Sequence, residues 1–333
     1  MKKVLLATTM LAGTAGFASA EVSVTGYAEI GIWSYNYLNG GVWDNAVAFH
    51  QDVEVTFNMS GTTDGGLEFG AKIDLDEGDV PVNDDNGTEV WISGAFGKLT
   101  MGDTDGALDW ALADMDGGMT SIADDHTTHA AWFGGADMDG IYDNQVVRYE
   151  NTFGDVSFAI SAEQALNGRS PAGWARQPGD TYGVAVKYNA NLGGTDVALG
   201  LGYQQGDDYS EVGGVGTGGK FSAVGVSAAA TLAGGFGGKI GYISFDDATW
   251  DNHVGLEVSY NSGPIGVAVN YGKVELSNGT TLPDGSTSFD SWGAVANYDL
   301  GGGAKVMFGY GSDLDAGTTG NQDQWSLGLG LSF

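Results

Sequence analysis

The residues best suited to chemistry are the carboxylates of a single segment, residues 103–143. This segment holds two His, no Lys or Arg and ten Asp: Asp103, Asp105, Asp109, Asp114, Asp116, Asp124, Asp125, Asp137, Asp139 and Asp143. Like charges beside a narrow aqueous passage repel anions and enrich cations. Carboxylate oxygens also suit a hard divalent cation such as calcium. Both interpretations of the segment stay open at this point.

The calcium hypothesis depends on two short runs within the segment. Asp103 and Asp105 precede Gly106, and Asp137 and Asp139 precede Gly140. A third run of Asn and Asp lies in residues 83–87. None of these runs has a Glu six residues beyond its Gly, so none completes an EF-hand loop. The sequence therefore predicts calcium ligands at Asp103, Asp105, Asp137 and Asp139 without a known calcium-loop motif.

Catalytic motifs are missing from the sequence. His126 and His129 lie three residues apart near Asp124 and Asp125, a spacing that allows metal binding. However, no GxSxG, HExxH or P-loop motif occurs in a strand-to-helix context. The chain has no Cys, which excludes a disulfide framework and a thiolate zinc site. We therefore predict that the protein is not an enzyme, with a membrane-bound hydrolase as the weaker alternative.

The composition of the chain excludes one class of binding partner. The 333 residues include 43 acidic and 12 basic residues, for a formal net charge of −31. A protein this acidic has no basic face with which to release counterions from phosphates, so we predict no nucleic-acid partner. There are 58 Gly, yet aromatic residues make up 11% of the chain, which argues against disorder.

The N-terminus reads as an export signal. Lys2 and Lys3 form a positive region, residues 4–17 are mainly apolar, and Ala18-Ser19-Ala20 is a small-residue cleavage site. We expect residues 1–20 to be a cleaved signal peptide and residues 21–333 to form the mature protein. A short transmembrane helix is the alternative, but the segment lacks about 20 unbroken apolar residues.

Beyond residue 21 the chain alternates apolar and polar residues. In residues 53–59 and 67–75, for example, every second side chain is apolar, which is the period of a strand rather than a helix. The pattern predicts sixteen strands, with boundaries uncertain by about 2 to 4 residues. They lie near 22–37, 47–60, 66–76, 88–95, 98–103, 144–152, 155–165, 180–189, 195–205, 219–232, 235–246, 252–262, 264–276, 287–299, 303–312 and 322–333. Short Gly-bearing or polar turns alternate with longer acidic loops, as in an up-and-down membrane barrel.

In a barrel this wide, the apolar side chains of each strand must face outward. Sixteen strands enclose a space that is too wide for side chains to fill. We therefore expect outer-membrane lipid around the barrel and water inside it, solvating inward residues. These are Glu54, Glu68, Lys72, Asp74, Arg148, Glu150, Glu163, Lys187, Glu257 and Lys305. Of these, Glu54, Lys72, Arg148 and Lys187, together with His50, are predicted to form the pore wall opposite the acidic segment.

Taken together, the signal, the Gly-rich strands, the long third loop and the last strand resemble a Gram-negative general porin of the Rhodobacter type. The last strand, residues 324–333, carries Trp325 and ends in Phe333, and it is similar to the C-terminal signal that outer-membrane assembly machinery reads in that family. The resemblance implies a homotrimer in the cell outer membrane, a third loop folded into the lumen, and structural calcium. It covers the whole mature chain.

We therefore predict an all-β fold, a 16-stranded antiparallel transmembrane barrel, acting as a passive diffusion channel for small hydrophilic solutes and ions. Loop residues Asp103, Asp105, Asp109, Asp114 and Asp116 are expected to form the constriction and to favour cations. We predict that no cofactor is required, and structural calcium stays open as the one metal that would suit the carboxylates. Two other functions stay open: a substrate-specific porin, for which Trp110 and Trp132 offer aromatic faces to sugars, and a secreted calcium-binding β-protein of the RTX type, although its tandem GGxGxD repeats are missing.

Overall fold

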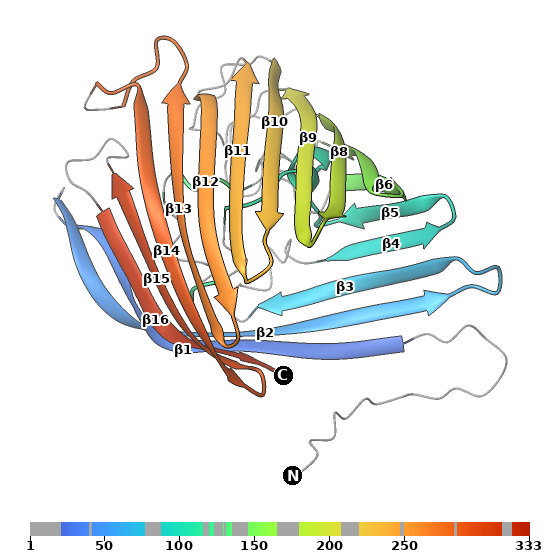
Figure 1. The fold of residues 1–333 in the computed structure, drawn as a ribbon, viewed down its shortest axis with the longest axis horizontal. Coiled ribbons are helices and arrows are strands. Elements are labelled where there is room, and N and C mark those ends of the chain that lie inside the picture. The colour runs from blue at the N-terminus through green and yellow to red at the C-terminus, as the bar shows by residue number, and fades with distance from the viewer. Residues whose placement is uncertain are drawn as a thin grey trace.

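The protein is described from a computed structural model. It describes residues 21–39, 42–76, 88–115, 120–122, 129, 131–134, 146–164, 180–207, 220–246, 250–282, 285–314 and 322–333. Within these residues the chain forms one short helix and sixteen strands, joined in a closed barrel (Figure 1). No helix in this described part is long and apolar enough to cross a membrane.

Every strand pairs antiparallel with its neighbours in sequence. The elements are β1 (Glu21–Asn39), β2 (Val42–Thr62), β3 (Glu68–Asp76), β4 (Glu89–Gly94), β5 (Gly97–Gly102), α1 (Ala107–Ala111), β6 (Val146–Phe153), β7 (Val156–Glu163), β8 (Thr181–Leu192), β9 (Thr195–Asp207), β10 (Lys220–Thr231), β11 (Phe236–Asp246), β12 (Trp250–Ser262), β13 (Ile265–Leu276), β14 (Ser288–Gly301), β15 (Ala304–Leu314) and β16 (Gln322–Ser332). The predicted strand number and order are confirmed, and most predicted ends agree within two residues.

The first and last strands close the barrel. In the register of β1 and β16, Tyr27 pairs with Ser332 and Trp33 with Ser326. The terminal residue extends this pairing, because the Phe333 amide donates to the Gly26 carbonyl at 2.8 Å. Closure matters because an open edge in hydrocarbon would leave backbone groups without partners, at several kcal/mol each.

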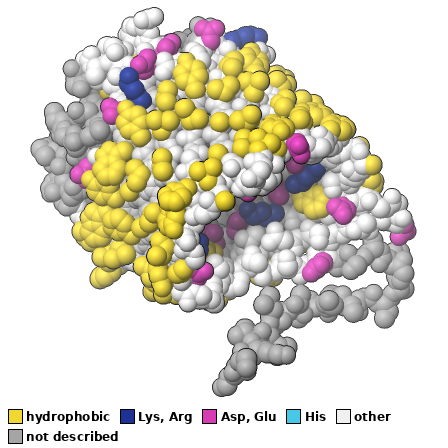
Figure 2. Space-filling model, in the orientation of Figure 1, with side chains coloured by type: hydrophobic (Ala, Val, Ile, Leu, Met, Phe, Trp, Pro, Cys, Tyr) yellow, Lys and Arg dark blue, Asp and Glu magenta, His cyan; other side chains and the backbone are white. Residues whose placement is uncertain are grey.

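The two faces of the wall differ in chemistry. On β8, Val184 and Val186 are exposed, whereas Gly183 and Ala185, which alternate with them, are buried. Exposed apolar residues continue to alternate with buried residues through β9 to β13, where most buried residues are small or polar and the large apolar ones are Phe221, Ile243, Phe245 and Val274. Figure 2 shows hydrophobic side chains gathered over the outside of the strands that face the viewer. The prediction of an apolar outer face is confirmed.

The buried core lies between the wall and the segment after β5, rather than between two sheets. One cluster joins Leu108, Leu112, Met115 and Phe133 of that segment to wall residues Phe221, Ala223, Ile243 and Phe245. A second joins Ala107 and Ala111 to Ala159 and Ala185. Figure 1 shows the short helix behind β8 and β9. This segment therefore supplies much of the apolar burial of the described chain.

One expectation from the sequence is wrong. We expected water to solvate all of the inward charged residues, but Arg148 and Glu257 are buried, and so is Glu163. Arg148 contacts Asp105, and Lys239, the ion-pair partner of Glu257, contacts Asp114. Segment residues therefore cover two of these groups, and ion pairing replaces much of the hydration that burial removes.

Candidate functional site

The acidic segment leaves β5 and at once contacts the wall. The Asp103 amide donates to the Thr88 carbonyl at 2.8 Å, and the Ala107 amide donates to Ser161 Oγ on β7 at 2.8 Å. Helix α1 follows, with Leu108 and Ala111 buried and Asp109 half-buried. The helix is short and ends at Ala111.

Inward glycines let the main chain approach the wall. A side chain added to Gly200 on β9 would overlap the carbonyl oxygen of Ala111, and one on Gly272 of β13 would overlap that of Ala131. Such overlaps force a shift of backbone rather than of a flexible side chain. Part of the high Gly content thus reserves space for this segment.

Polar wall residues bind the segment's backbone along its course. Ser227 Oγ on β10 accepts from the Ala113 amide at 3.0 Å, and Lys239 Nζ on β11 donates to the Asp114 carbonyl at 2.7 Å. Asn270 Nδ2 on β13 donates to the Met115 carbonyl. Further along the segment, Asn297 Nδ2 on β14 donates to the Thr120 carbonyl at 3.1 Å. Backbone groups that would otherwise be buried without partners are satisfied in this way.

His129 forms a second attachment point. Its Nε2 lies 2.8 Å from Asn270 Oδ1, and its Nδ1 contacts Ser291 Oγ, which accepts from the Ala131 amide at 2.8 Å. These partners fit a neutral ring in which Nε2 donates and Nδ1 accepts. Burial lowers the pKa of His129 from its usual value, and the hydrogen bond with Asn270 offsets part of that shift. The imidazole is therefore held in its uncharged form.

Aromatic contacts fix the far part of the segment. Phe133 is buried, and its ring lies 4.9 Å from that of His253 on β12. His253 Nε2 lies 3.0 Å from the Ala131 carbonyl, to which it donates. Ile122 lies against Gly31 of β1 and Gly328 of β16, where an added side chain would overlap it. The described parts of the segment thus contact the wall from β7 round to β1.

Charged residues concentrate where the segment begins. Arg148 Nε lies 3.0 Å from Glu150 Oε2, and Arg148 Nη1 lies 3.6 Å from Asp105 Oδ2. Nη1 also donates to the Asp105 carbonyl at 2.6 Å. The Asp105 side chain is 59% exposed even so. Lys187 Nζ lies 4.2 Å above the centre of the Trp110 ring.

The other predicted wall residues lie elsewhere on the barrel. His50 Nε2 lies 3.1 Å from Glu29 Oε2, and its ring is edge-on to Trp33 at 6.0 Å. Lys72 Nζ lies 3.1 Å from Asp74 Oδ2. Glu54 lies opposite Tyr27 and Asp76 in register. These residues belong to β1, β2 and β3, so the structure does not bring them together with Arg148 and Lys187.

The structure describes only some of the carboxylates of the acidic segment. Asp114 is exposed and Asp103 is half-buried. Asp116, Asp137, Asp139 and His126 lie outside the described residues. Among the described residues, no group of three or more His, Asp or Glu is placed to hold a metal ion. Asp105, a predicted calcium ligand, instead contacts Arg148.

The C-terminal residues of the predicted assembly signal have different environments. Ser34 Oγ bonds both backbone groups of Trp325, accepting from its amide at 2.7 Å and donating to its carbonyl at 3.3 Å. Phe333 is 80% exposed, and its backbone forms two hydrogen bonds with Gly26 of β1.

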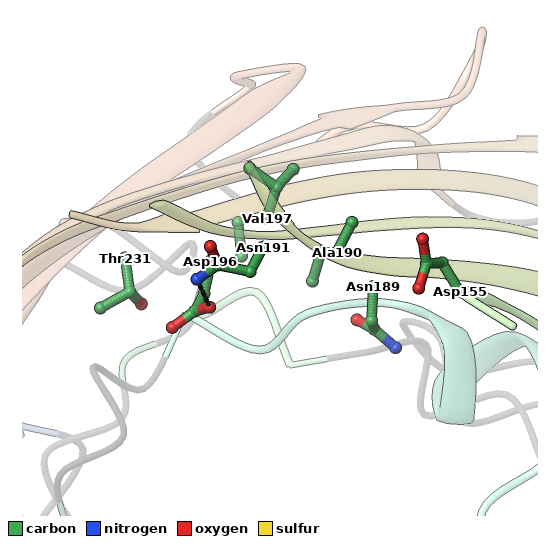
Figure 3. A pocket seen from close by; sticks show the side chains of 9 residues that line it. Asp155, Asn189, Ala190, Asn191, Asp196, Val197 and Thr231 are labelled. Carbon is green, nitrogen blue, oxygen red and sulfur yellow. Dashed lines mark hydrogen bonds between the residues drawn. The ribbon is translucent and has the colours of Figure 1, made fainter. Parts of the chain in front are cut away.

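A shallow pocket is lined by residues near the turn between β8 and β9, by Asp155 of the turn between β6 and β7, and by the end of β10 (Figure 3). Its polar lining includes Asp155, Asn189, Asn191 and Asp196. Asn191 Nδ2 donates to Asp196 Oδ1 at 2.7 Å, the contact dashed in the figure. In that view the carboxylates of Asp155 and Asp196 lie apart, so the pocket does not converge on one bound group.

Sequence reasoning did not identify Asn270, Ser291 and His253 as partners of the segment. Each of these residues is at a position of its strand whose side chain points inward. However, a single Asn, Ser or His in a strand forms no sequence motif that would identify it as a binding partner. A weak signal existed in the runs of Gly and Ser at inward positions of β8 to β14, which predict a close-packed neighbour.

A closed antiparallel barrel with an apolar outer face and a polar inner face defines the class of outer-membrane β-barrel proteins. The model of the Gram-negative porin family matches residues 7–332, and the chain belongs to that family. It is 29% identical to the porin of Rhodobacter capsulatus over 306 residues, which cover 87% of this chain and 93% of that protein.

Solved structures show the same fold. A porin structure refined at 1.8 Å is 24% identical and matches with a TM-score of 0.67 over 94% of this chain and 100% of that one. A triple mutant of the Rhodopseudomonas blastica porin is 18% identical, with a TM-score of 0.58 over 94% of this chain and 100% of its own. The protein is therefore an outer-membrane channel rather than an enzyme. Membership of the porin family rules against the alternative of a secreted calcium-binding protein.

Proposed function

We propose that this porin is a general diffusion channel with a preference for cations, and that the segment after β5 lies in the lumen as its constriction. The observation that carries the proposal is that the segment's described parts contact inward residues from β7 round to β1. A polar solute then crosses in water and avoids the cost of transfer into hydrocarbon.

The charge of the segment supports the cation preference. Asp105 and Asp114 are exposed, and Asp103 and Asp109 are half-buried. On the facing wall, Arg148 contacts two carboxylates, Asp105 and Glu150, so its positive charge is largely offset locally. The net charge that lines the passage is therefore negative, because acidic groups dominate it.

The test is planar-bilayer recording in asymmetric KCl. We expect stepwise ohmic conductance and a reversal potential of the sign that cation selectivity gives. Changing Asp103, Asp105, Asp109 and Asp114 together to Asn should move the reversal potential towards zero. The charge-matched control changes four exposed Asp at the short turns, Asp64, Asp155, Asp196 and Asp299, to Asn. Anion selectivity of the unmodified protein, or equal shifts in both variants, would reject the acidic constriction.

We also propose that the protein is a homotrimer. The short strands β4 to β7 support this proposal. β4 and β5 have 6 residues each and β6 and β7 have 8 each, whereas β2 has 21. A tilted strand needs about 9 to 11 residues to cross the apolar layer. A neighbouring copy of the chain would shield this side from lipid. Cross-linking in detergent should give a trimer, and cysteines introduced on β4 should react between subunits more readily than cysteines on β11.

The alternative of a sugar-specific porin rests on Trp110, whose ring is half-buried in the segment. Liposome-swelling assays separate the two functions. Passage of neutral sugars and amino acids in order of size supports the general channel. Saturable inhibition by one sugar, lost in Trp110→Leu, would favour the specific one.

A further inference from the structure

Trp110 presents an aromatic ring at the start of the constriction, next to acidic groups. It lies in α1 and packs on the alanine cluster of Ala107, Ala111, Ala159 and Ala185. Asp109 precedes it in the helix, and Asp105 lies one turn before that. The face of an indole ring attracts cations, more strongly than the faces of Tyr or Phe. An aromatic ring flanked by carboxylates is the usual recognition chemistry for organic ammonium groups.

In this protein a lysine of the wall already covers the ring. Lys187 Nζ lies 4.2 Å from the ring centre, well within the distance of about 6 Å at which a cation–π contact counts. Lys187 pairs in register with Gly200, where the Ala111 carbonyl at the end of α1 approaches the wall, so the helix that carries Trp110 is held beside the lysine. The lysine is half-exposed, so water and solutes reach it.

This lysine shares its kind of contact with Lys98, which lies 5.4 Å from the centre of the Trp91 ring, and differs from four inward cations that contact carboxylates. Lys72, Arg148, Lys239 and Lys273 each contact a carboxylate within 3.6 Å. For Lys187 the contact that the structure shows is the aromatic ring. Burial and the nearby Arg148 guanidinium disfavour the positive charge on its ammonium, whereas the carboxylates of Asp105, Glu150 and Asp109 favour it. The same three carboxylates would attract any cation placed on the ring.

We propose that the Trp110 face is a subsite for organic ammonium groups and that Lys187 is its tethered occupant, which prevents such cations from being retained in the pore. The inference rests on the proposed function, since it requires the segment to border the conducting path. Conduction needs sites that bind weakly enough to release the ion. A lysine that permanently occupies the ring meets that need while leaving the carboxylates to attract mobile cations.

The experiment measures block of the KCl current by tetramethylammonium in planar bilayers. Lys187→Met removes the charge and keeps a side chain of similar length, so the ring becomes available. We expect tetramethylammonium to block this variant with a dissociation constant lower than that of the unmodified channel by about 2- to 30-fold, the range of a cation–π contact. Lys187→Arg, which keeps a cation over the ring, should behave like the unmodified channel.

Two further variants make the test specific. Lys187→Met combined with Trp110→Leu should lose the added block, because the ring is gone. Lys72→Met removes one inward positive charge without uncovering an aromatic ring, and it should leave the block unchanged. If Lys72→Met strengthens the block as much as Lys187→Met, or if the double variant keeps it, the aromatic subsite is refuted.

The outcomes also separate this inference from the proposed function. An unmodified protein that forms no ohmic pores refutes the proposed function. Ohmic, cation-selective pores whose tetramethylammonium block is the same in Lys187→Met as in the unmodified channel refute the subsite alone. Heat-resistant oligomers on electrophoresis and stepwise ohmic channels in KCl would show that a variant is folded.

Discussion

The guanidinium of Arg148 contacts both the carboxylate and the main-chain carbonyl of Asp105. Its Nη1 lies 3.6 Å from the carboxylate oxygen Oδ2 and 2.6 Å from the carbonyl oxygen of the same residue, while its Nε contacts Glu150. One buried guanidinium therefore ties the start of the acidic segment to β6. Only Arg has the donors in fixed geometry to make three such contacts at once.

Replacing Arg148 should release this end of the segment and make the pore more acidic. For Arg148→Met we expect a stronger cation preference, because the carboxylates of Asp105 and Glu150 lose their partner, and noisier open-channel current. Bilayer recording checks both. Lys72→Met, which removes an equal charge from an ion pair on β3, is the control. An identical response of both variants would show that net charge alone matters.

Gly272 should be required for the segment to pack. In Gly272→Ala the new methyl group would overlap the carbonyl oxygen of Ala131, so the His129 region must move. We expect faster proteolytic cleavage between residues 129 and 134 and a loss of stability of about 1–3 kcal/mol, the usual cost of overpacking. Gly238→Ala on β11 is the matched control, since its methyl group would make an ordinary contact of 3.6 Å with the Glu257 carbonyl. Equal cleavage of both variants would contradict the prediction.

Acid should loosen the same region. Burial lowers the pKa of His129, so the folded protein favours the neutral ring more than the unfolded chain does. Its contribution to stability is therefore fully present above the unfolded pKa of about 6.5 and falls as the pH drops below that value. We expect protease cleavage of the segment to increase below about pH 6.5.

The control for this pH effect is His129→Gln, in which the increase should be smaller. His253, which donates to the Ala131 carbonyl, also faces the region and retains a share of the response. Ser291 and Asn270, the other contacts of the ring, do not titrate in this range. The same pH profile in the unmodified protein and in His129→Gln would assign the effect to other groups.

The barrel could be predicted from the sequence because its signal is local and repeated. Val184 and Val186 point to lipid and Ala185 to the interior whatever the neighbouring strands do, since strand parity alone decides this. Sixteen repetitions of that rule fixed the strand count, and the requirement of closure fixed the order of pairing.

The attachment of the segment could not be predicted in the same way. His129 contacts Asn270 and Ser291, which lie 141 and 162 residues further along the chain. No periodicity relates these positions, and each depends on the height of a residue within the barrel, which parity leaves undetermined. Burial of Arg148 was missed for the same reason.

Calcium binding stays a prediction for Asp103, Asp105, Asp137 and Asp139. If these residues bind a structural calcium ion, excess chelator should lower the unfolding temperature and added calcium should restore it. Magnesium should be less effective, because it demands stricter geometry and releases water reluctantly. The variant Asp103→Asn/Asp105→Asn should lose the response. A chelator effect that persists in this variant would place the ion elsewhere on the protein.

Phe333 should serve assembly more than stability. The residue is 80% exposed, whereas its amide and carbonyl both pair with Gly26 of β1. Because Phe333→Ala keeps that backbone pairing, we expect the purified variant to refold in detergent and to unfold within a few degrees of the unmodified protein.

In cells the same variant should accumulate poorly in the outer membrane, since the exposed terminal aromatic ring is what the assembly machinery is expected to read. Quantifying the porin in outer-membrane fractions, against a refolding assay of the same variant, separates the two roles. The control is Phe153→Ala, which removes another exposed aromatic ring, at the end of β6. If Phe333→Ala reaches the membrane normally, or if it fails to refold in detergent, the ring is not an assembly signal of this kind.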